Sequence, residues 1–179
     1  MSIERKTISL SDKRFDTISQ DIRKSYKNSC ILWIEEIKNP GLEELYQTQK
    51  TEIEKKRKKP CKELQLYHGT NEVSADIIIK EGFNPELNKR AAYGRGSYFA
   101  TNAVYSCHNF CSPSKDDVSF VLLCSVLVGE IGKYGVMQPI DTKKHDNSVD
   151  NQLNPTIYAT PYQFGAIPRY LIAFHKNAK

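Results

Sequence analysis

Two short segments of the sequence combine glycine with side chains that could hold a small ligand. The first, residues 64–70, alternates apolar and polar residues and ends in His68, Gly69 and Thr70. Such alternation predicts a β-strand, so His68 would stand at a strand end, where its ring could hydrogen-bond a ligand hydroxyl. The Gly69 backbone, which has no Cβ, could approach a flat amide. The second segment, residues 93–100, carries two glycines before Tyr98. From these residues alone, an ordinary structural role is the more frequent outcome.

A third group, Cys107, His108 and Cys111, has the side-chain types of a zinc site or of a Cys–His nucleophile pair. The spacing is not the C-x2-C of zinc sites, and a fourth ligand would have to come from far along the chain. Adjacent residues of a helix point about 100° apart, so Cys107 and His108 would not face each other. We therefore favour a helix with buried thiols and expect no metal.

The most concentrated charge is the run of five basic residues at 55–59, in a chain whose net charge is +5. The remainder is close to neutral, so a nucleic-acid-binding surface over the whole protein is not implied. The run itself could be a nuclear import signal or a nucleic-acid patch, but such runs are more often solvated linkers. We favour the linker and do not expect this chain to bind nucleic acid.

The composition is that of a folded domain, with 39% hydrophobic and 26% charged residues in a chain of 179. These values exclude a disordered tail, a collagen-like chain and a membrane bundle. The longest apolar run, residues 118–128, is far shorter than the roughly 20 residues of a membrane-spanning helix. Residues 1–6 contain no apolar segment of a signal peptide, and the five scattered cysteines argue against a disulfide framework. We expect a monomer without membrane contact in the cytoplasm or nucleus.

The order of elements is helices first and then many short strands. Apolar spacing predicts helices over residues 15–22, with Ser11 or Asp12 as the cap, and 42–53, and a short helix over 75–80 that ends at Gly82. Residues 31–37 fit strand or helix, and we favour strand because Asn39, Pro40 and Gly41 follow. Further strands are expected at 64–68, 97–100, 118–128, 157–160 and 169–174, with loops at 84–97 and 133–154. This order favours an α+β fold with antiparallel sheets.

Taken together, these segments resemble the catalytic domain of poly(ADP-ribose) polymerase-type ADP-ribosyltransferases, within the diphtheria-toxin-like superfamily whose signature is His-Tyr-Glu. The resemblance rests on residues 66–70, 93–100 with Ser106 eight residues after Tyr98, 122–129 and 155–174, in that order. It implies the ADP-ribosyltransferase fold, in which flanking helices and an N-terminal helical lead-in surround two packed antiparallel or mixed β-sheets. It also implies an extension at 1–14 and a catalytic domain at 15–179. Within that domain, 15–63 would hold helices, a strand and the basic linker, and 64–175 the NAD-binding core.

The resemblance also implies which residues hold NAD. His68 would bond a hydroxyl of the adenine-side ribose, Gly69 and Ser106 would hold the nicotinamide carboxamide, and Tyr98 would pack on the nicotinamide ring. Phe110 is a candidate for the other face of that ring, although its offset from Ser106 does not match cleanly. Residues 84–92 would form the donor loop, with Arg90 or Lys89 facing the pyrophosphate. Thr70 and Tyr105 complete the expected NAD-binding set.

The third signature position departs from the polymerising members, which have Glu there. Ungapped alignment places Ile157 at it, and no Glu or Asp follows Asp150. Isoleucine has no base to activate a hydroxyl for chain growth, so the resemblance implies NAD-dependent mono-ADP-ribosylation of protein side chains. We expect the acceptor side chains to be acidic and the chain itself to be among the acceptors. A catalytically inactive module that binds NAD or proteins is the alternative, because Gly165 and Asn84 also depart from the family pattern. The helical regulatory domain of the DNA-activated branch does not fit in about 60 N-terminal residues.

Overall fold

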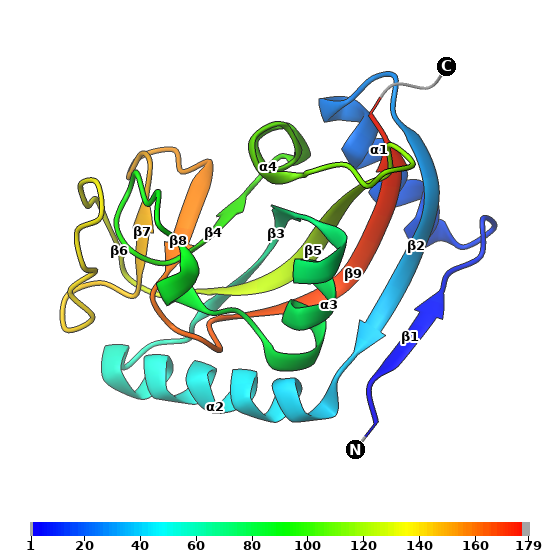
Figure 1. Ribbon diagram of the computed structural model, residues 1–179. Helices are drawn as coiled ribbons and strands as arrows, with labels where there is room; N and C mark the ends of the chain where they lie inside the picture. Colours follow the sequence, from blue (N-terminus) through cyan, green and yellow to red (C-terminus); the bar gives the residue numbers. More distant parts are fainter. Residues whose placement is uncertain (1, 177–179) are drawn as a thin grey trace.

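The computed structural model describes residues 2–176 and contains a nine-stranded sheet flanked by helices (Figure 1). The strand order is β1-β2-β9-β5-β3-β4-β8-β7-β6, and the pairs are antiparallel except β6 with β7. The expected α+β class is thereby confirmed. No helix in this part of the chain has the length and apolar character needed to cross a membrane.

The N-terminal region builds one edge of the sheet. It contains β1 (Glu4–Thr7), α1 (Lys13–Ser25), β2 (Cys30–Lys38) and α2 (Pro40–Arg57). Asp12 caps α1 by accepting the Arg14 N–H at 2.8 Å, and the strand interpretation of 31–37 is confirmed by β2. Residues 4–7, which we assigned to an extension, instead pair with β2 as the edge strand. All four of them are exposed, so the sequence has no alternation of apolar residues that would predict this strand.

Three long strands form the centre of the molecule: β3 (Lys62–Thr70), β5 (Ser119–Val128) and β9 (Ala166–His175). Strand β5 lies between the other two and is buried along nearly its whole length. Its side chains alternate between two hydrophobic clusters, because successive residues of a strand point to opposite faces. Phe120 and Leu122 join the cluster that contains α3 (Glu72–Glu81), whereas Val121 and Leu123 join the one that contains α1 and α4 (Ala103–Phe110).

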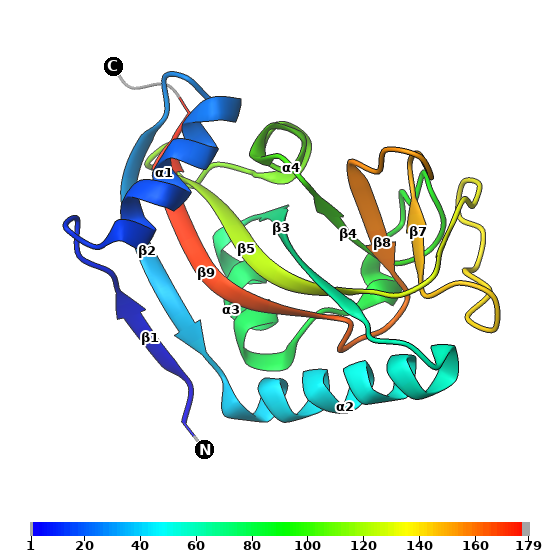
Figure 2. The ribbon, with the colours of Figure 1, turned by 180° about the vertical axis from the view of Figure 1, so that it is seen from behind.

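The remaining strands form a second, smaller part of the sheet: β4 (Ser97–Ala100), β8 (Ile157–Thr160), β7 (Asn147–Val149) and β6 (Ile131–Gly132). A single residue pair, Tyr67 with Ala100, joins β4 to β3. Figure 2 shows this part to one side of β3 and the long curved strands on the other. The two expected sheets are therefore connected at one point. The expected loop at 133–154 is interrupted by β7, which is only three residues long.

The basic run at 55–59 is not a solvated linker. Its first three residues form the last turn of α2, and Lys58 caps the helix in the left-handed conformation. Lys56 and Arg57 form ion pairs of 2.6 and 2.7 Å with Asp146, whose side chain is completely buried. The run thus fastens α2 to the segment before β7, which is 89 residues further along the chain.

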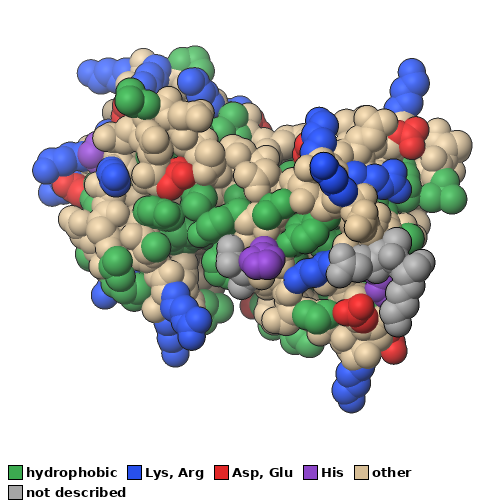
Figure 3. Space-filling model, turned by 90° about the horizontal axis from the view of Figure 1, so that it is seen from above, with side chains coloured by type: hydrophobic (Ala, Val, Ile, Leu, Met, Phe, Trp, Pro, Cys, Tyr) green, Lys and Arg blue, Asp and Glu red, His purple; other side chains and the backbone are tan. Residues whose placement is uncertain are grey.

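The upper face of the molecule is hollowed between two lobes (Figure 3). Hydrophobic side chains gather in the hollow, and Lys and Arg side chains project from the outer parts of the lobes. Beneath the surface, the two parts of the sheet diverge beyond the single pair that joins β3 to β4. The end of β3 and the start of β4, both expected to carry site residues, belong to this region.

Candidate active site

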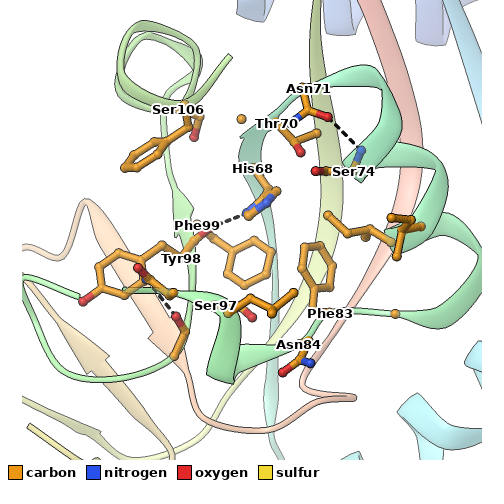
Figure 4. Close-up of a pocket in the computed structure, with 18 of the residues that line it drawn as sticks. His68, Thr70, Asn71, Ser74, Phe83, Asn84, Ser97, Tyr98, Phe99 and Ser106 are labelled. Atoms are coloured by element: carbon orange, nitrogen blue, oxygen red, sulfur yellow. Dashed lines mark hydrogen bonds between the residues drawn. The ribbon is translucent and has the colours of Figure 1, made fainter. Parts of the chain in front are cut away.

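A cavity of about 420 Å³ opens where β3 and β4 diverge. The end of β3, helix α3, the segment with the short 3-10 helix η1 (Pro85–Leu87), strand β4 and helix α4 form its walls (Figure 4). Most of the expected NAD-binding residues line it: His68, Gly69, Thr70, Tyr98, Tyr105, Ser106 and Phe110. These residues come from three separate elements, β3, β4 and α4, and meet around one space large enough for part of a dinucleotide.

His68 projects from β3 toward the cavity with a defined ring orientation. Its Nδ1 lies 2.8 Å from the Tyr98 carbonyl oxygen, as Figure 4 shows. A carbonyl oxygen only accepts hydrogen bonds, so Nδ1 must carry the proton. Burial lowers the pKa of His68 below its usual 6.5, so the ring is neutral at pH 7 and Nε2 keeps a free lone pair. His68 is thus prepared to accept a hydrogen bond from a ligand hydroxyl.

Tyr98 uses its hydroxyl to hold the wall of the cavity. The hydroxyl donates to the Gly94 carbonyl at 2.7 Å and accepts the Tyr93 N–H at 2.7 Å. Burial raises the pKa of Tyr98 to about 12, so the phenol stays neutral and does not serve as a base. With its hydroxyl committed to the turn, Tyr98 offers the face of its ring to a ligand.

Ser106 and Gly69 bring α4 unusually close to β3. The Ser106 hydroxyl is buried and donates to the Tyr67 carbonyl at 2.9 Å. A Cβ placed on Gly69 would lie 1.9 Å from the Ser106 carbonyl oxygen, so only glycine fits there. In the described chain β4 pairs with β3 at Tyr67 alone, which leaves the Gly69 edge open to a ligand. The Ser106 oxygen keeps lone pairs for an amide N–H, and this corner can hold a carboxamide.

Two buried phenylalanines support the His68 ring from below. Phe83, which follows α3, contacts it edge-on with ring centroids 5.0 Å apart, and Phe99 of β4 lies 5.5 Å away. Both rings line the cavity. The sequence analysis did not find them. Phe99 was visible only as an apolar residue of a short strand, and Phe83 only as an apolar residue beside Gly82.

The aromatic residues of α4 form the opposite rim. Tyr105 and Phe110 have ring centroids 5.8 Å apart and both border the cavity. Phe110 is nearly half exposed at 47%, so a ligand ring could cover it. Burial raises the pKa of Tyr105, and its hydroxyl is neutral at pH 7. This rim and Tyr98 offer flat apolar surfaces on the α4 side of the cavity.

Some expected residues lie away from the cavity. Arg90 and Lys89 are exposed and are not part of its lining, whereas Asn84, Leu87 and Asn88 of the same loop are. Ile157 is buried on β8 opposite Ala100 and does not line the cavity either. The roles we assigned to Arg90 and Ile157 stay predictions. Gln163, to which the sequence analysis assigned no role, does reach the lining.

Helix α3 contributes a wall that the sequence analysis did not foresee. Ser74, Ile77, Ile78 and Glu81 face the cavity, and the Asn71 side chain caps the helix by accepting the Ser74 N–H at 2.8 Å. The sequence offered two signals for this wall: Ser74, three positions after Asn71, and the apolar residues Ile77 and Ile78. They could not be assigned to a ligand because the core also needs apolar residues on α3.

The cysteines of α4 behave as the sequence analysis predicted. Cys107 and Cys111 are buried in the cluster with α1, whereas His108 is exposed. The thiol and the imidazole therefore point apart. The side-chain contact with Cys111 raises the pKa of the Cys107 thiol, and burial raises it further. Within residues 2–176, no three His, Cys, Asp or Glu side chains come together as metal ligands.

Comparison with known proteins adds independent information about this chain. A family model described as the poly(ADP-ribose) polymerase catalytic domain matches residues 12–174. The protein mono-ADP-ribosyltransferase PARP14 of Homo sapiens is 31% identical over 93% of this chain. PARP12 of Mus musculus, named with the same activity, is 29% identical over all of it, and the mouse protein mono-ADP-ribosyltransferase PARP11 is 28% identical over 90%.

The chain spans only part of these relatives. It covers 10% of PARP14, 26% of PARP12 and 57% of PARP11. The matched region includes all residues that line the cavity, since these lie between positions 68 and 163. The comparisons therefore concern the domain that carries the candidate active site.

Proposed function

The chain belongs to the poly(ADP-ribose) polymerase catalytic domain family, and from that premise we propose that it is a protein mono-ADP-ribosyltransferase with NAD as its co-substrate. The observation that supports this most strongly is the corner formed by His68, Gly69 and Ser106. There a neutral imidazole acceptor, an open strand edge and a serine oxygen surround one cavity. These groups match the hydroxyls and the carboxamide of NAD.

The proposed pose of NAD follows from the hydrogen-bonding groups. The nicotinamide carboxamide would lie against the Gly69 backbone and the Ser106 oxygen, with its ring against Tyr98 and the α4 rim. His68 Nε2 would accept a hydrogen bond from a hydroxyl of the adenine-side ribose. The adenosine would then extend along α3, where Ile77 and Ile78 offer apolar contacts and Asn84 and Ser74 polar ones.

The reaction breaks the bond between C1′ of the ribose and the pyridinium nitrogen. The bonding pair leaves with nicotinamide, which becomes neutral, and positive charge develops on the ribose ring. An acceptor carboxylate then donates an electron pair to C1′ and forms an ester. The carboxylate is already ionised at pH 7, so the enzyme needs no base. Its contribution is to fix the leaving amide and the ribose, which is catalysis by positioning and electrostatics.

Addition of a single ADP-ribose is favoured by the residue at the third signature position. Growth of a polymer requires a hydroxyl of bound ADP-ribose to act as nucleophile, and a hydroxyl needs a base. Ile157 has no titratable group and is 5% exposed on β8. An acidic side chain of a protein acceptor supplies its own charge. We propose proteins, including this chain itself, as acceptors.

The second candidate is an inactive module of the same fold. Its specific support is that neither Ile157 nor Gly165 provides a polar group at positions where the family pattern has one. Such a module would bind NAD in the same cavity and modify nothing. The location in the cytoplasm or nucleus and the monomeric state remain proposals from composition.

Intact-mass spectrometry after incubation with NAD separates these functions. A transferase gains whole ADP-ribose units at separate residues, and neutral hydroxylamine removes them if they are esters of carboxylates. A protein whose mass is unchanged but whose melting temperature rises with NAD, as a ligand that binds only the folded state requires, would be the inactive module. Repeated additions to one residue would contradict the proposal of single transfer.

A further inference from the structure

Two lysine-rich segments that are far apart in the sequence meet at one end of the molecule. The first is residues 55–59 at the end of α2, and the second is residues 141–146 before β7. The Lys56 ammonium donates to the Thr142 carbonyl at 3.0 Å, and the Arg57 guanidinium donates to the Lys143 carbonyl at 3.0 Å. Both views of the ribbon show the loop beside the end of α2 (Figures 1 and 2). We call residues 55–59 and 141–146, together with Glu130, the lysine face.

The lysine face is held rigidly from beneath. Asp146 accepts hydrogen bonds from Arg57 at 2.7 Å and from the Tyr162 hydroxyl at 2.9 Å, and its side chain has no exposed area. Lys56 and Arg57 both pair with Asp146, so one of their two positive charges is neutralised inside the fold. The residues around them, Lys143 and Lys144 among them, remain exposed.

Most of the excess charge of the chain is gathered here. The lysine face has seven Lys or Arg residues and three acidic residues, an excess of four, and the whole chain has a net charge of +5. Lys144 is 74% exposed and its pair with Asp141 is loose at 3.5 Å. Lys59 is 52% exposed beside Glu130. Exposed pairs of this kind are weak, so these lysines can exchange their partners for an incoming anion.

The loop that leads into residues 141–146 is attached to the turn just before strand β4 of the candidate active site. The Met137 N–H donates to the Ala91 carbonyl at 2.8 Å, and the Arg95 N–H donates to the Gln138 carbonyl at 2.9 Å. Residues 91–95 include the turn that the Tyr98 hydroxyl holds. The lysine face is therefore connected, through residues 137–140, to the turn that precedes the cavity-lining residues Gly96, Ser97 and Tyr98.

We propose that the lysine face is a docking surface for acidic segments of acceptor proteins. This inference rests on the proposed function, in which the nucleophile is an ionised carboxylate. Carboxylates that occur in acidic stretches would be concentrated near the cavity by the field of the lysines, which raises the rate of encounter.

Nucleic acid is the less suitable polyanion for this surface. Its single strands are held by aromatic side chains that stack on bases as well as by cations. The two tyrosines that contact the lysine face, Tyr134 and Tyr162, already bond residues of this chain. Tyr162 bonds Asp146 and lies beneath the Lys56 ammonium, and the Tyr134 hydroxyl bonds His145 and the Asp141 N–H. Glu130 and Asp141 also interrupt the positive surface, which a peptide with spaced carboxylates tolerates better than a continuous phosphate backbone.

The test is charge reversal of two exposed lysines, K143E/K144E, in the full chain. The matched control is K24E/K27E at the end of α1 and in the turn after it, at the other end of the molecule, where Lys24 forms a similar i,i+3 pair with Asp21 at 3.7 Å. The probes are a fluorescent peptide with one central Glu between acidic flanks and the same peptide with neutral flanks. Peptide affinity is measured by anisotropy, and transfer and hydrolysis of NAD are measured in parallel.

We expect the Kd and KM of the acidic peptide to rise about tenfold in K143E/K144E at low salt, because two exposed attractions become repulsions. The effect should fade at high salt. K24E/K27E and K143R/K144R should match the wild type, and kcat and NAD hydrolysis should not change. Equal Kd values in all variants would refute the docking surface whether or not transfer occurs, whereas absence of transfer with a lysine-dependent Kd would refute only the proposed function. Binding of an RNA or DNA oligonucleotide that K143E/K144E abolishes, without peptide binding, would overturn the inference in favour of nucleic acid.

Discussion

Replacing Gly69 with alanine tests the close approach of β3 to α4 that shapes the carboxamide corner. The new Cβ would lie 1.9 Å from the Ser106 carbonyl oxygen and 2.6 Å from its carbon, whereas ordinary contacts begin at 3.4 Å. The obstructing atoms are backbone atoms of a helix, so no side-chain rotation can relieve the overlap. Helix α4 or strand β3 must therefore move by about 1.5 Å, the difference between these distances.

The cost of this movement can be estimated for both stability and activity. Overpacking of a core costs about 1–3 kcal/mol, and we expect the upper end because backbone meets backbone. For a chain of this size that lowers the melting temperature by roughly 6–12 °C. A shift of the Ser106 region by more than 1 Å would misplace the leaving amide and reduce kcat/KM for NAD by about a hundredfold.

The assay compares thermal unfolding and label transfer from NAD in Gly69→Ala and in a matched variant, Gly41→Ala. A Cβ on Gly41 meets only the Asn39 side-chain oxygen at an ordinary 3.6 Å, and Gly41 lies in the first turn of α2. Alanine is the better helix former by up to about 1 kcal/mol, so this variant should melt no lower than the wild type. If Gly69→Ala kept the melting temperature and activity of the wild type, the described contact between β3 and α4 would be incorrect.

Three further predictions concern the charge and chemistry of single residues. Because burial lowers the pKa of His68 below 6.5, the ring stays neutral in the folded protein while the unfolded chain takes up a proton first. Its contribution to stability is complete above pH 6.5 and is lost as the pH falls below that value. Because the ring of the folded protein stays neutral from pH 7.5 to 6.5, kcat/KM for NAD should be constant over this range. A fall with a midpoint above 6.5 would count against the neutral acceptor. Asp146→Ala should cost about 3 kcal/mol in the free energy of unfolding, measured with urea, because Arg57 and Lys56 lose their buried partner; an unchanged midpoint would show that this network does not fasten α2. Burial alone would raise the pKa of Asp146, but the hydrogen bonds that it accepts lower it overall, so its contribution should be lost as the pH falls below about 4. Ile157→Glu should still give single additions, because a carboxylate alone provides no site for an acceptor ribose; long chains on a gel would contradict this.

Local patterns in the sequence were sufficient for most of the fold. Alternation of apolar and polar residues predicted β3, a continuous apolar run predicted β5, and Asp12 as a cap predicted the start of α1. Each of these patterns is a property of neighbouring residues. Strand β1 was missed since its exposed residues carry no alternation and its pairing with β2 is a tertiary effect. The basic run was misread for the same reason, because its partner Asp146 is 89 residues away from Arg57.

The candidate site could be assembled only in part. His68, Gly69, Tyr98 and Ser106 were found because their order and spacing resembled a family, not because any one residue was distinctive. The Phe83 and Phe99 rings beneath His68 gave the same apolar signal as the core. The orientation of a loop cation such as Arg90 depends on solvent and backbone geometry, which spacing does not encode.

Incubation of the chain with labelled NAD, beside the His68→Ala variant, tests the central claim most directly. His68→Ala removes the acceptor for the ribose hydroxyl while leaving the glycine corner and Ser106 in place. We predict label on the wild type as a single sharp band and none on His68→Ala. Equal labelling of the two proteins would contradict the assignment of this cavity as the active site, and a ladder on the wild type would contradict transfer of a single ADP-ribose.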